Sequence, residues 1–243
     1  MQVPLPPADR AVVILSGAGL SAASGVPTFR GPGGYWQGHK ATDLATPQAF
    51  ARDPDLVLDF YAMRRSTVDG VTFNPGHAAL ARLQAAWGAE RVVLVTQNID
   101  GLIQAAAAAD GTSADVIEMH GTLWRERCAR DPAHPMVPVD PDRDARGTCA
   151  VCDARLRPHI VWFGEIPHHI DRIEEAVRRA GVLLSVGTSG VVYPAAGIAD
   201  MARRCGAHTV EVNPDPTGGP FDQTIAEGSE GALPRIVGEW LGG

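Results

Sequence analysis

A short apolar run followed at once by a glycine loop constrains this chain more than any other feature. Val12 to Leu15 are all apolar, and Ser16 and Gly17 follow directly. Four apolar residues are too few for a helix, so the run predicts a buried strand of a parallel sheet. Gly17, Gly19 and Ala22 then give the spacing G-x-G-x-x-A, in which bare backbone lets a pyrophosphate approach main-chain N–H groups at a helix N-terminus. Alone, this spacing also occurs in tight turns of unrelated folds.

Strand and helix patterns alternate at both ends of the chain, which predicts an α/β fold with a Rossmann-like, doubly wound parallel sheet. We expect further strands at 91–96, 116–119, 161–165, 182–186 and 208–212. We expect helices within 47–68, with a second one starting at Asp53-Pro54, at 75–87 behind an Asn74 cap, after Gly101, and at 171–180, 195–204 and 233–241.

Two irregular stretches interrupt this pattern and predict a smaller composite second domain. Residues 120–160 are rich in Pro, Asp, Arg and Cys and have almost no periodicity, as in a loop-rich module. We assign 1–30, 75–122 and 159–243 to the Rossmann-like domain. The small domain takes 31–74, a helical insertion, and 123–158, the Cys-containing module.

Composition and charge restrict the class of protein. The 243 residues are 45% apolar and 20% charged, and the formal net charge of -7 comes without a Lys/Arg cluster, so we expect no nucleic-acid partner. No run approaches the ~20 apolar residues of a membrane span, and the first residues lack a signal-peptide pattern. We therefore expect a cytoplasmic monomer without a membrane partner. Four cysteines, including Cys149-x-x-Cys152, favour a reducing compartment.

The continuation of the glycine loop, GAGLSAASGVPTFR at 17–30, resembles the signature of the sirtuins, the NAD-consuming protein deacylases. TQNID at 96–100, His120-Gly121 and GTS at 187–189 follow in the family's order, and Ala23 stands where many members have Glu. The resemblance covers nearly the whole chain. It implies an NAD-dependent protein-lysine deacylase whose partners are acyl-lysine-bearing proteins.

The resemblance also implies how NAD is bound. A hydride-transferring enzyme would carry an Asp or Glu ~20 residues after the glycine loop to hold the ribose, but here that region reads GPGGYW. In the sirtuins an Asn, matched by Asn213, holds the ribose, with Ser229 near the adenine, which favours NAD as a consumed co-substrate. The cofactor-binding set is Gly17, Ala18, Gly19, Ser21, Phe29, Arg30, Trp36, Gln97, Asn98, Ile99, Asp100, Gly187, Thr188, Ser189, Asn213 and Ser229.

Cleavage of the nicotinamide–ribose bond requires a pocket for the departing carboxamide and a base for a ribose hydroxyl. Asp100 and Asn98 suit the first task, and His120, which titrates near neutral pH, suits the second. By resemblance, Asp100 and the Ile99 main chain grip the nicotinamide amide, Gln97 and Asn98 position the ribose, and His120 activates the ribose hydroxyl that takes the acyl group. The implied products are free lysine, nicotinamide and O-acyl-ADP-ribose.

Two segments are candidates for substrate binding. Val161, Trp162, Phe163 and Gly164 resemble the family's peptide-binding segment, although the same letters suit an ordinary hydrophobic strand. Tyr61 and Arg64 stand three apart on a predicted helix and so share a face.

Without a resemblance, Tyr61 would be expected to pack on Phe60 and Arg64 to be solvated. The Tyr-x-x-Arg pair is similar to that of the class III sirtuins, which recognise the distal carboxylate of malonyl- and succinyl-lysine. We therefore expect removal of acetyl groups and, preferentially, of succinyl and malonyl groups.

The cysteines suggest a structural zinc site of zinc-ribbon type, with one ligand in doubt. The family uses two C-x-x-C pairs, whereas here Cys128 stands alone with Asp131 in its partner's place. Cys128, Cys149 and Cys152 completed by Asp131, or by His134, would be chemically allowed. A lost or labile site is the alternative.

Two other functions share these motifs. The chain could be an NAD or ADP-ribose sensor without turnover, although the joint presence of His120, Asn98 and Asp100 argues against an inert pocket. A mono-ADP-ribosyltransferase would use the same first step and leave label from NAD on protein.

Overall fold

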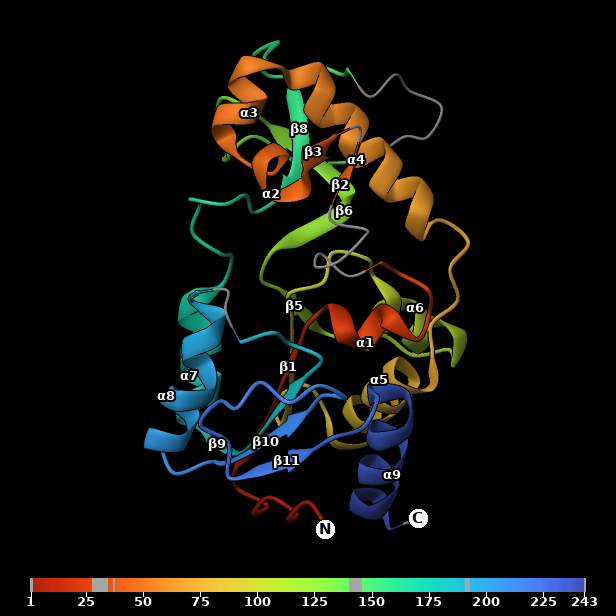
Figure 1. Cartoon of the computed structure of the whole chain (residues 1–243), viewed down its shortest axis with the longest axis vertical. Coiled ribbons are helices and arrows are strands. Elements are labelled where there is room, and N and C mark those ends of the chain that lie inside the picture. Colours follow the sequence, from red (N-terminus) through yellow and green to blue (C-terminus); the bar gives the residue numbers. More distant parts are fainter. Residues whose placement is uncertain (1, 28–34, 37, 140–145, 191–192, 243) are drawn as a thin grey trace.

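The computed structural model describes residues 2–27, 35–36, 38–139, 146–190 and 193–242 of the chain. Figure 1 shows two parts: a larger part around a parallel sheet, and a smaller part in which helices pack on an antiparallel sheet. Both chain ends lie on the larger part, away from the smaller one. Across the described residues, no helix combines the length and apolar character needed to cross a bilayer.

The larger part is built on a six-stranded sheet whose neighbouring strands all pair in parallel, in the order β11-β10-β9-β1-β4-β5. From β1 the chain builds outward through β4 to β5, and later through β9 and β10 to β11. The order therefore reverses between β1 and β9, where open α/β sheets bind ligands beyond the carboxyl ends of their strands. The strands are β1 (Ala11–Ser16), β4 (Val92–Thr96), β5 (Val116–Glu118), β9 (Ala180–Val186), β10 (His208–Val212) and β11 (Gln223–Ile225).

Helices cover both faces of this sheet, so its central strands are apolar throughout. All six residues of β1 are buried: Val12 and Ile14 join the core on one face, and Val13 and Leu15 the core on the other. The first face is covered by α1 (Ala18–Ala22), α5 (Pro75–Trp87), α6 (Leu102–Ala109) and α9 (Ser229–Leu241). The second is covered by α7 (Ile170–Arg178), the short 3-10 turn η2 (Ala195–Gly197) and α8 (Ile198–Arg204).

The smaller part packs three helices against a three-stranded antiparallel sheet of order β7-β6-β8. Tyr61, Phe60, Leu123 and Trp162 are among its fully buried residues. Its helices are α2 (Ala41–Leu44), α3 (Pro47–Arg52) and α4 (Pro54–Val68). Its strands are β6 (Gly121–Cys128), β7 (Val137–Pro138), β8 (Leu156–Ile160) and the hairpin of β2 (Tyr35–Trp36) with β3 (His39–Lys40).

The predicted α/β class with a parallel sheet is confirmed, as is the Asn74 cap of α5: its side chain accepts from the N–H of Gly76, with Pro75 at the first turn. One local prediction is wrong and one is incomplete. The strand expected at 161–165 lies instead at 156–160, as β8, and the stretch 120–160, expected to be rich in loops, also contains β6 and β7. β6 does not alternate apolar and polar residues as a half-buried strand usually does. Its pairing with β8 shifts register between Gly121 and Glu126, and the Glu126 side chain is buried.

Candidate active site

Two glycine loops cross at the switch point of the sheet. The Gly19 N–H donates to the carbonyl oxygen of Gly187 at 2.9 Å, and the Gly17 N–H donates to that of Val186 at 2.9 Å. A methyl group on Gly19 would lie 2.6 Å from the Cα of Gly187, so the two backbones touch. Only glycine allows this approach, which sets bare backbone and the start of α1 at the carboxyl ends of β1 and β9.

The predicted adenosine-side residues surround this crossing. The Asn213 side chain donates to the carbonyl oxygen of Thr188 at 2.9 Å, and the Thr188 hydroxyl lies 3.0 Å from that of Ser185. Ser229, at the start of α9, is buried with its hydroxyl 3.4 Å from the carbonyl oxygen of Gly19. Ala18 and Ser189 belong to the same two loops and are half-buried.

A buried polar cluster lies between α1 and the loop after β4. Ser21 donates to a carboxylate oxygen of Asp100 at 2.7 Å and accepts from the Asn98 amide at 3.0 Å. The second Asp100 oxygen accepts from the N–H of Leu102 at 3.0 Å. These bonds hold Asp100, which is 9% exposed, and Asn98 in fixed positions. Ser21 of the first motif and Asn98 and Asp100 of the second therefore form one cluster.

His77, which is not among the predicted site residues, also belongs to this cluster. Its Nδ1 accepts the N–H of Asn74 at 3.2 Å, so its proton is on Nε2, which lies 3.2 Å from the Ser21 hydroxyl. His77 is fully buried, and burial lowers its pKa to about 4, although the nearby Asp100 opposes the shift. Ser21 thus donates once and accepts twice. The sequence signal was the histidine three residues after the helix cap, where it closes a capping box.

His120 follows β5 and is half-buried at the same edge of the sheet. Its Nδ1 lies 3.2 Å from the carbonyl oxygen of Gln97, an acceptor only, so Nδ1 carries the proton and Nε2 is the basic nitrogen. Burial lowers the pKa of His120, and the hydrogen bond to Gln97 partly opposes this. The ring is therefore neutral, oriented and able to accept a proton.

The predicted acyl pair lies on the inner face of α4. Tyr61 is 1% exposed and packs edge-on against Phe60 at 5.0 Å between ring centroids, and Arg64 is 9% exposed. The expectation of a solvated Arg64, which residue patterns alone favour, is therefore wrong. Burial lowers the pKa of Arg64, and the neighbouring Tyr61 and Asp100 oppose this shift. A buried guanidinium thus lies near the carboxylate of the Asp100 cluster.

The segment 161–164 runs past His120 and packs into the smaller part. The Val161 N–H donates to the carbonyl oxygen of His120 at 2.9 Å, and Trp162 is buried. Phe163 is 45% exposed and Gly164 adopts a left-handed backbone conformation. Ile99 lies in the same apolar core as Trp162. This segment therefore connects His120 to the apolar core that contains Tyr61.

Some predicted residues fall outside this description. Phe29 and Arg30 lie outside the described residues, and for Trp36 only the backbone, in β2, is described.

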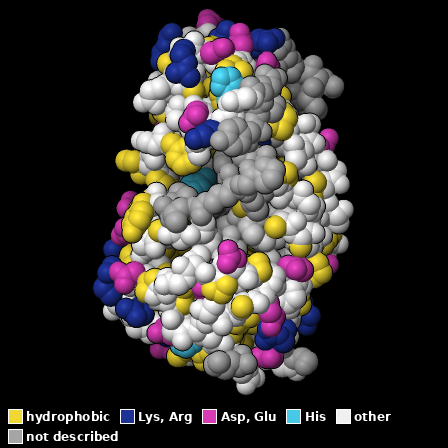
Figure 2. Space-filling model, in the orientation of Figure 1, with side chains coloured by type: hydrophobic (Ala, Val, Ile, Leu, Met, Phe, Trp, Pro, Cys, Tyr) yellow, Lys and Arg dark blue, Asp and Glu magenta, His cyan; other side chains and the backbone are white. Residues whose placement is uncertain are grey.

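On the face shown in Figure 2, acidic and basic side chains are intermixed rather than separated by sign.

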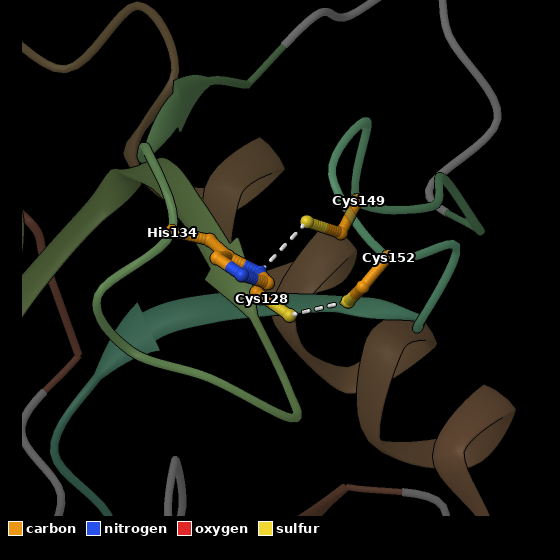
Figure 3. A group of neighbouring side chains, drawn as sticks. All are labelled: Cys128, His134, Cys149 and Cys152. Atoms are coloured by element: carbon orange, nitrogen blue, oxygen red, sulfur yellow. Dashed lines mark hydrogen bonds between the residues drawn. The ribbon is translucent and has the colours of Figure 1, made fainter.

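The three predicted cysteines and His134 converge in the smaller part, beside the end of β6 (Figure 3). Their ligand atoms lie within 4.8 Å of one another: the sulfurs of Cys128 and Cys152 are 3.5 Å apart, and Cys149 Sγ is 3.4 Å from His134 Nδ1. A tetrahedral zinc ion with Zn–S bonds of about 2.3 Å has ligand separations of roughly 3.8 Å. Three thiolates and one imidazole at this spacing fit zinc.

Asp131, the other candidate for the fourth ligand, contacts the far side of the His134 ring rather than lying among the thiols. Its Oδ2 is 3.6 Å from Nε2 of His134, while Nδ1 of that ring faces Cys149. Burial would raise the pKa of the Cys128 thiol, but the backbone N–H groups of Asp131 and Arg130, 3.4 Å away, help to lower it to about 6. The geometry favours His134 as the ligand and Asp131 as the group that orients it.

A doubly wound parallel sheet with glycine loops crossing at its switch point defines a Rossmann-like nucleotide-binding protein, here with an inserted small domain. Comparison with known families matches residues 17–194 to the Sir2 family, to which the chain belongs. It is 45% identical over 235 residues to "NAD-dependent protein deacylase 2" of Pyrobaculum aerophilum, covering 95% of this chain and 91% of that protein.

A second relative and a solved structure agree with this assignment. The NAD-dependent protein deacylase of Vibrio cholerae is 43% identical over 240 residues, covering 96% of this chain and 94% of that protein. A crystal structure of a Sir2 homologue in complex with NAD superimposes with a TM-score of 0.84 at 34% identity, covering 97% of this chain and 91% of that one. The resemblance to the sirtuins is confirmed.

Proposed function

We propose that this protein is an NAD-dependent protein-lysine deacylase that transfers the acyl group of a modified lysine to ADP-ribose. The observation that carries the proposal is the convergence of His120, Asn98 and Asp100 beside the glycine crossing. Family membership and the names of the relatives agree with it. The substrates are then proteins that bear acyl-lysines.

The chain's own groups suit each part of the reaction. The acyl oxygen of the modified lysine would attack the ribose carbon of NAD as the bond to nicotinamide breaks. A ribose hydroxyl would then bond to the acyl carbon, and one water would release the free lysine and leave O-acyl-ADP-ribose. Asp100 and the Ile99 main chain hold the carboxamide, and the Ser21 hydrogen bond keeps the Asp100 carboxylate in place. Asn98 and Gln97 orient the ribose. Nε2 of His120, left basic by the Nδ1–H bond to Gln97, accepts the proton of the ribose hydroxyl that attacks the acyl carbon.

A nicotinamide-release assay with an acyl-lysine peptide tests the activity. The wild type should release nicotinamide only when peptide is present, and His120→Ala should lose acyl transfer by about 100-fold or more, as expected for a general base. Acyl transfer unaffected by His120→Ala would refute the assignment. Binding of NAD without any turnover would indicate a sensor, and label from NAD retained on protein would indicate ADP-ribosyl transfer.

We further propose that acidic acyl groups, succinyl and malonyl, are preferred over acetyl. Arg64 is buried on the same face of α4 as Tyr61, and burial disfavours its charged form. A carboxylate entering beside it would accept a bidentate pair from the guanidinium and one bond from the phenol. The methyl group of an acetyl-lysine offers neither. Charge-assisted bonds are worth about 1.5–3 kcal/mol, which gives roughly tenfold discrimination or more.

One peptide carrying acetyl, malonyl, succinyl or longer acyl groups on the same lysine tests this preference. Arg64→Met should lower desuccinylation strongly and leave deacetylation within a few-fold, and Tyr61→Phe should act the same way but more weakly. Arg65→Met is the matched control, because it removes the adjacent half-buried arginine of the same helix. Equal loss of both activities in Arg64→Met would show that Arg64 supports the fold rather than recognising substrate.

A further inference from the structure

A partly buried ion pair contacts Trp162 at two points, with Arg157 over its ring and Glu165 at its backbone. The Arg157 guanidinium, on β8, donates to both carboxylate oxygens of Glu165, at 2.6 and 2.9 Å, and to the carbonyl oxygen of Ile160 at 2.8 Å. Its central carbon lies 3.3 Å from the centroid of the Trp162 ring, and Glu165 accepts the Trp162 backbone N–H at 2.8 Å. Both the backbone and the ring face of Trp162 are therefore held in place.

Within the described residues, Trp162 in turn holds the hydroxyl of Tyr61. The indole Nε1–H lies 2.9 Å from the Tyr61 oxygen. An indole nitrogen can only donate, so the Tyr61 oxygen is the acceptor and its own hydrogen must point elsewhere. No acceptor for that hydrogen occurs within the part of the chain that the structure describes. Burial raises the pKa of Tyr61, so the phenol keeps this hydrogen at neutral pH.

We propose that Trp162 is a positioning residue for acyl specificity, which presents the Tyr61 hydroxyl as a hydrogen-bond donor to the distal carboxylate of the substrate. The inference rests on the proposed preference for acidic acyl groups. A hydroxyl that already accepts one hydrogen bond is polarised and donates more strongly. Arg157 and Glu165 act indirectly, because Arg157 lies against the indole ring and Glu165 binds both Arg157 and the Trp162 backbone. An acetyl group accepts nothing from Tyr61, so its removal does not depend on this chain of contacts.

The proposal is tested with Trp162→Phe, which keeps an aromatic ring but removes the Nε1–H. We expect kcat/KM for the succinyl peptide to fall about three- to tenfold more than kcat/KM for the acetyl peptide, mainly through a higher KM, so that the succinyl-to-acetyl ratio drops by that factor. In a Tyr61→Phe background the same substitution should cause no further loss for succinyl, because Trp162 acts through the hydroxyl. Trp87→Phe, which alters the distant Trp87–Trp240 stack, is the matched control and should leave the succinyl-to-acetyl ratio unchanged.

Glu165→Gln provides a second variant in case Trp162→Phe folds poorly, and should shift the ratio in the same direction by a smaller factor. A wild-type ratio near one would refute the acyl preference and the positioning role together. A clear wild-type preference that is unchanged in Trp162→Phe would refute the positioning role alone. Equal losses for both peptides that persist without the Tyr61 hydroxyl would also overturn it, because they would make Trp162 a purely structural residue.

Discussion

Replacing Gly19 with alanine perturbs the crossing on which the proposed NAD site depends. The added methyl group would lie 2.6 Å from the Cα and 2.9 Å from the carbonyl oxygen of Gly187, and neither atom belongs to a side chain that can rotate away. One of the two loops must therefore move. Overpacking of this kind costs about 1–3 kcal/mol of folding free energy. The movement also breaks or lengthens the 2.9 Å hydrogen bond between the loops, and we expect NAD affinity to fall about tenfold or more.

Urea unfolding and NAD titration of the variant measure both effects. Gly238→Ala is the matched control, since the residue is inside α9 and the added methyl has no neighbour within 4 Å beyond the adjacent residues and the backbone of its own helix. It should stabilise the protein by about 0.5–1 kcal/mol, because glycine is unfavourable within helices, and leave NAD affinity unchanged. The reasoning would be refuted if Gly19→Ala matched the wild type in both unfolding free energy and NAD affinity.

Three further predictions concern titration and metal. Because burial lowers the pKa of His120, the acid limb of the pH profile of kcat/KM should lie below the ordinary histidine value of about 6.5; a limb above pH 7 would contradict a neutral base. His77 has a pKa of about 4 in the folded protein, so between pH 6.5 and 4 the unfolded chain binds more protons than the folded protein does. The free energy of unfolding should therefore fall as the pH falls through this window. The fall should be less steep in His77→Gln. His134→Ala should retain far less than one equivalent of zinc and unfold at a lower temperature. Asp131→Asn should weaken zinc binding only about 10–100-fold. Equal loss of zinc in the two variants would show that Asp131 is itself a ligand.

The sequence predicts the elements of the larger part well where local signals and packing agree. β1 is a buried apolar run bounded by glycine, and α5 begins at an Asn-Pro cap, so both were placed to within a residue or two. β11 was missed because it is a three-residue strand at the sheet edge, with little side-chain pattern to read. The antiparallel sheet of the smaller part was missed because β6 is irregular and Glu126 is buried.

Site residues are predictable where a sequence motif identifies them. They are less predictable where a residue joins the site only through contacts between segments that are distant in the sequence. The motif residues Ser21, Asn98 and Asp100 meet in one cluster, as family motifs imply. His77 joins them through space from another helix, which spacing cannot show. Likewise only the folded module brings the ring of His134, and not the carboxylate of Asp131, among the three thiols. The domain boundaries stay a prediction.

The most direct test of the proposed reaction follows the acyl group itself. A peptide with a ¹³C-labelled succinyl-lysine is incubated with NAD, and early products are identified by mass spectrometry. The account predicts one labelled acyl-ADP-ribose and one nicotinamide for each lysine freed, with both products lost in His120→Ala. Labelled free succinate formed without consumption of NAD, or ADP-ribose attached to protein in place of acyl transfer, would contradict it.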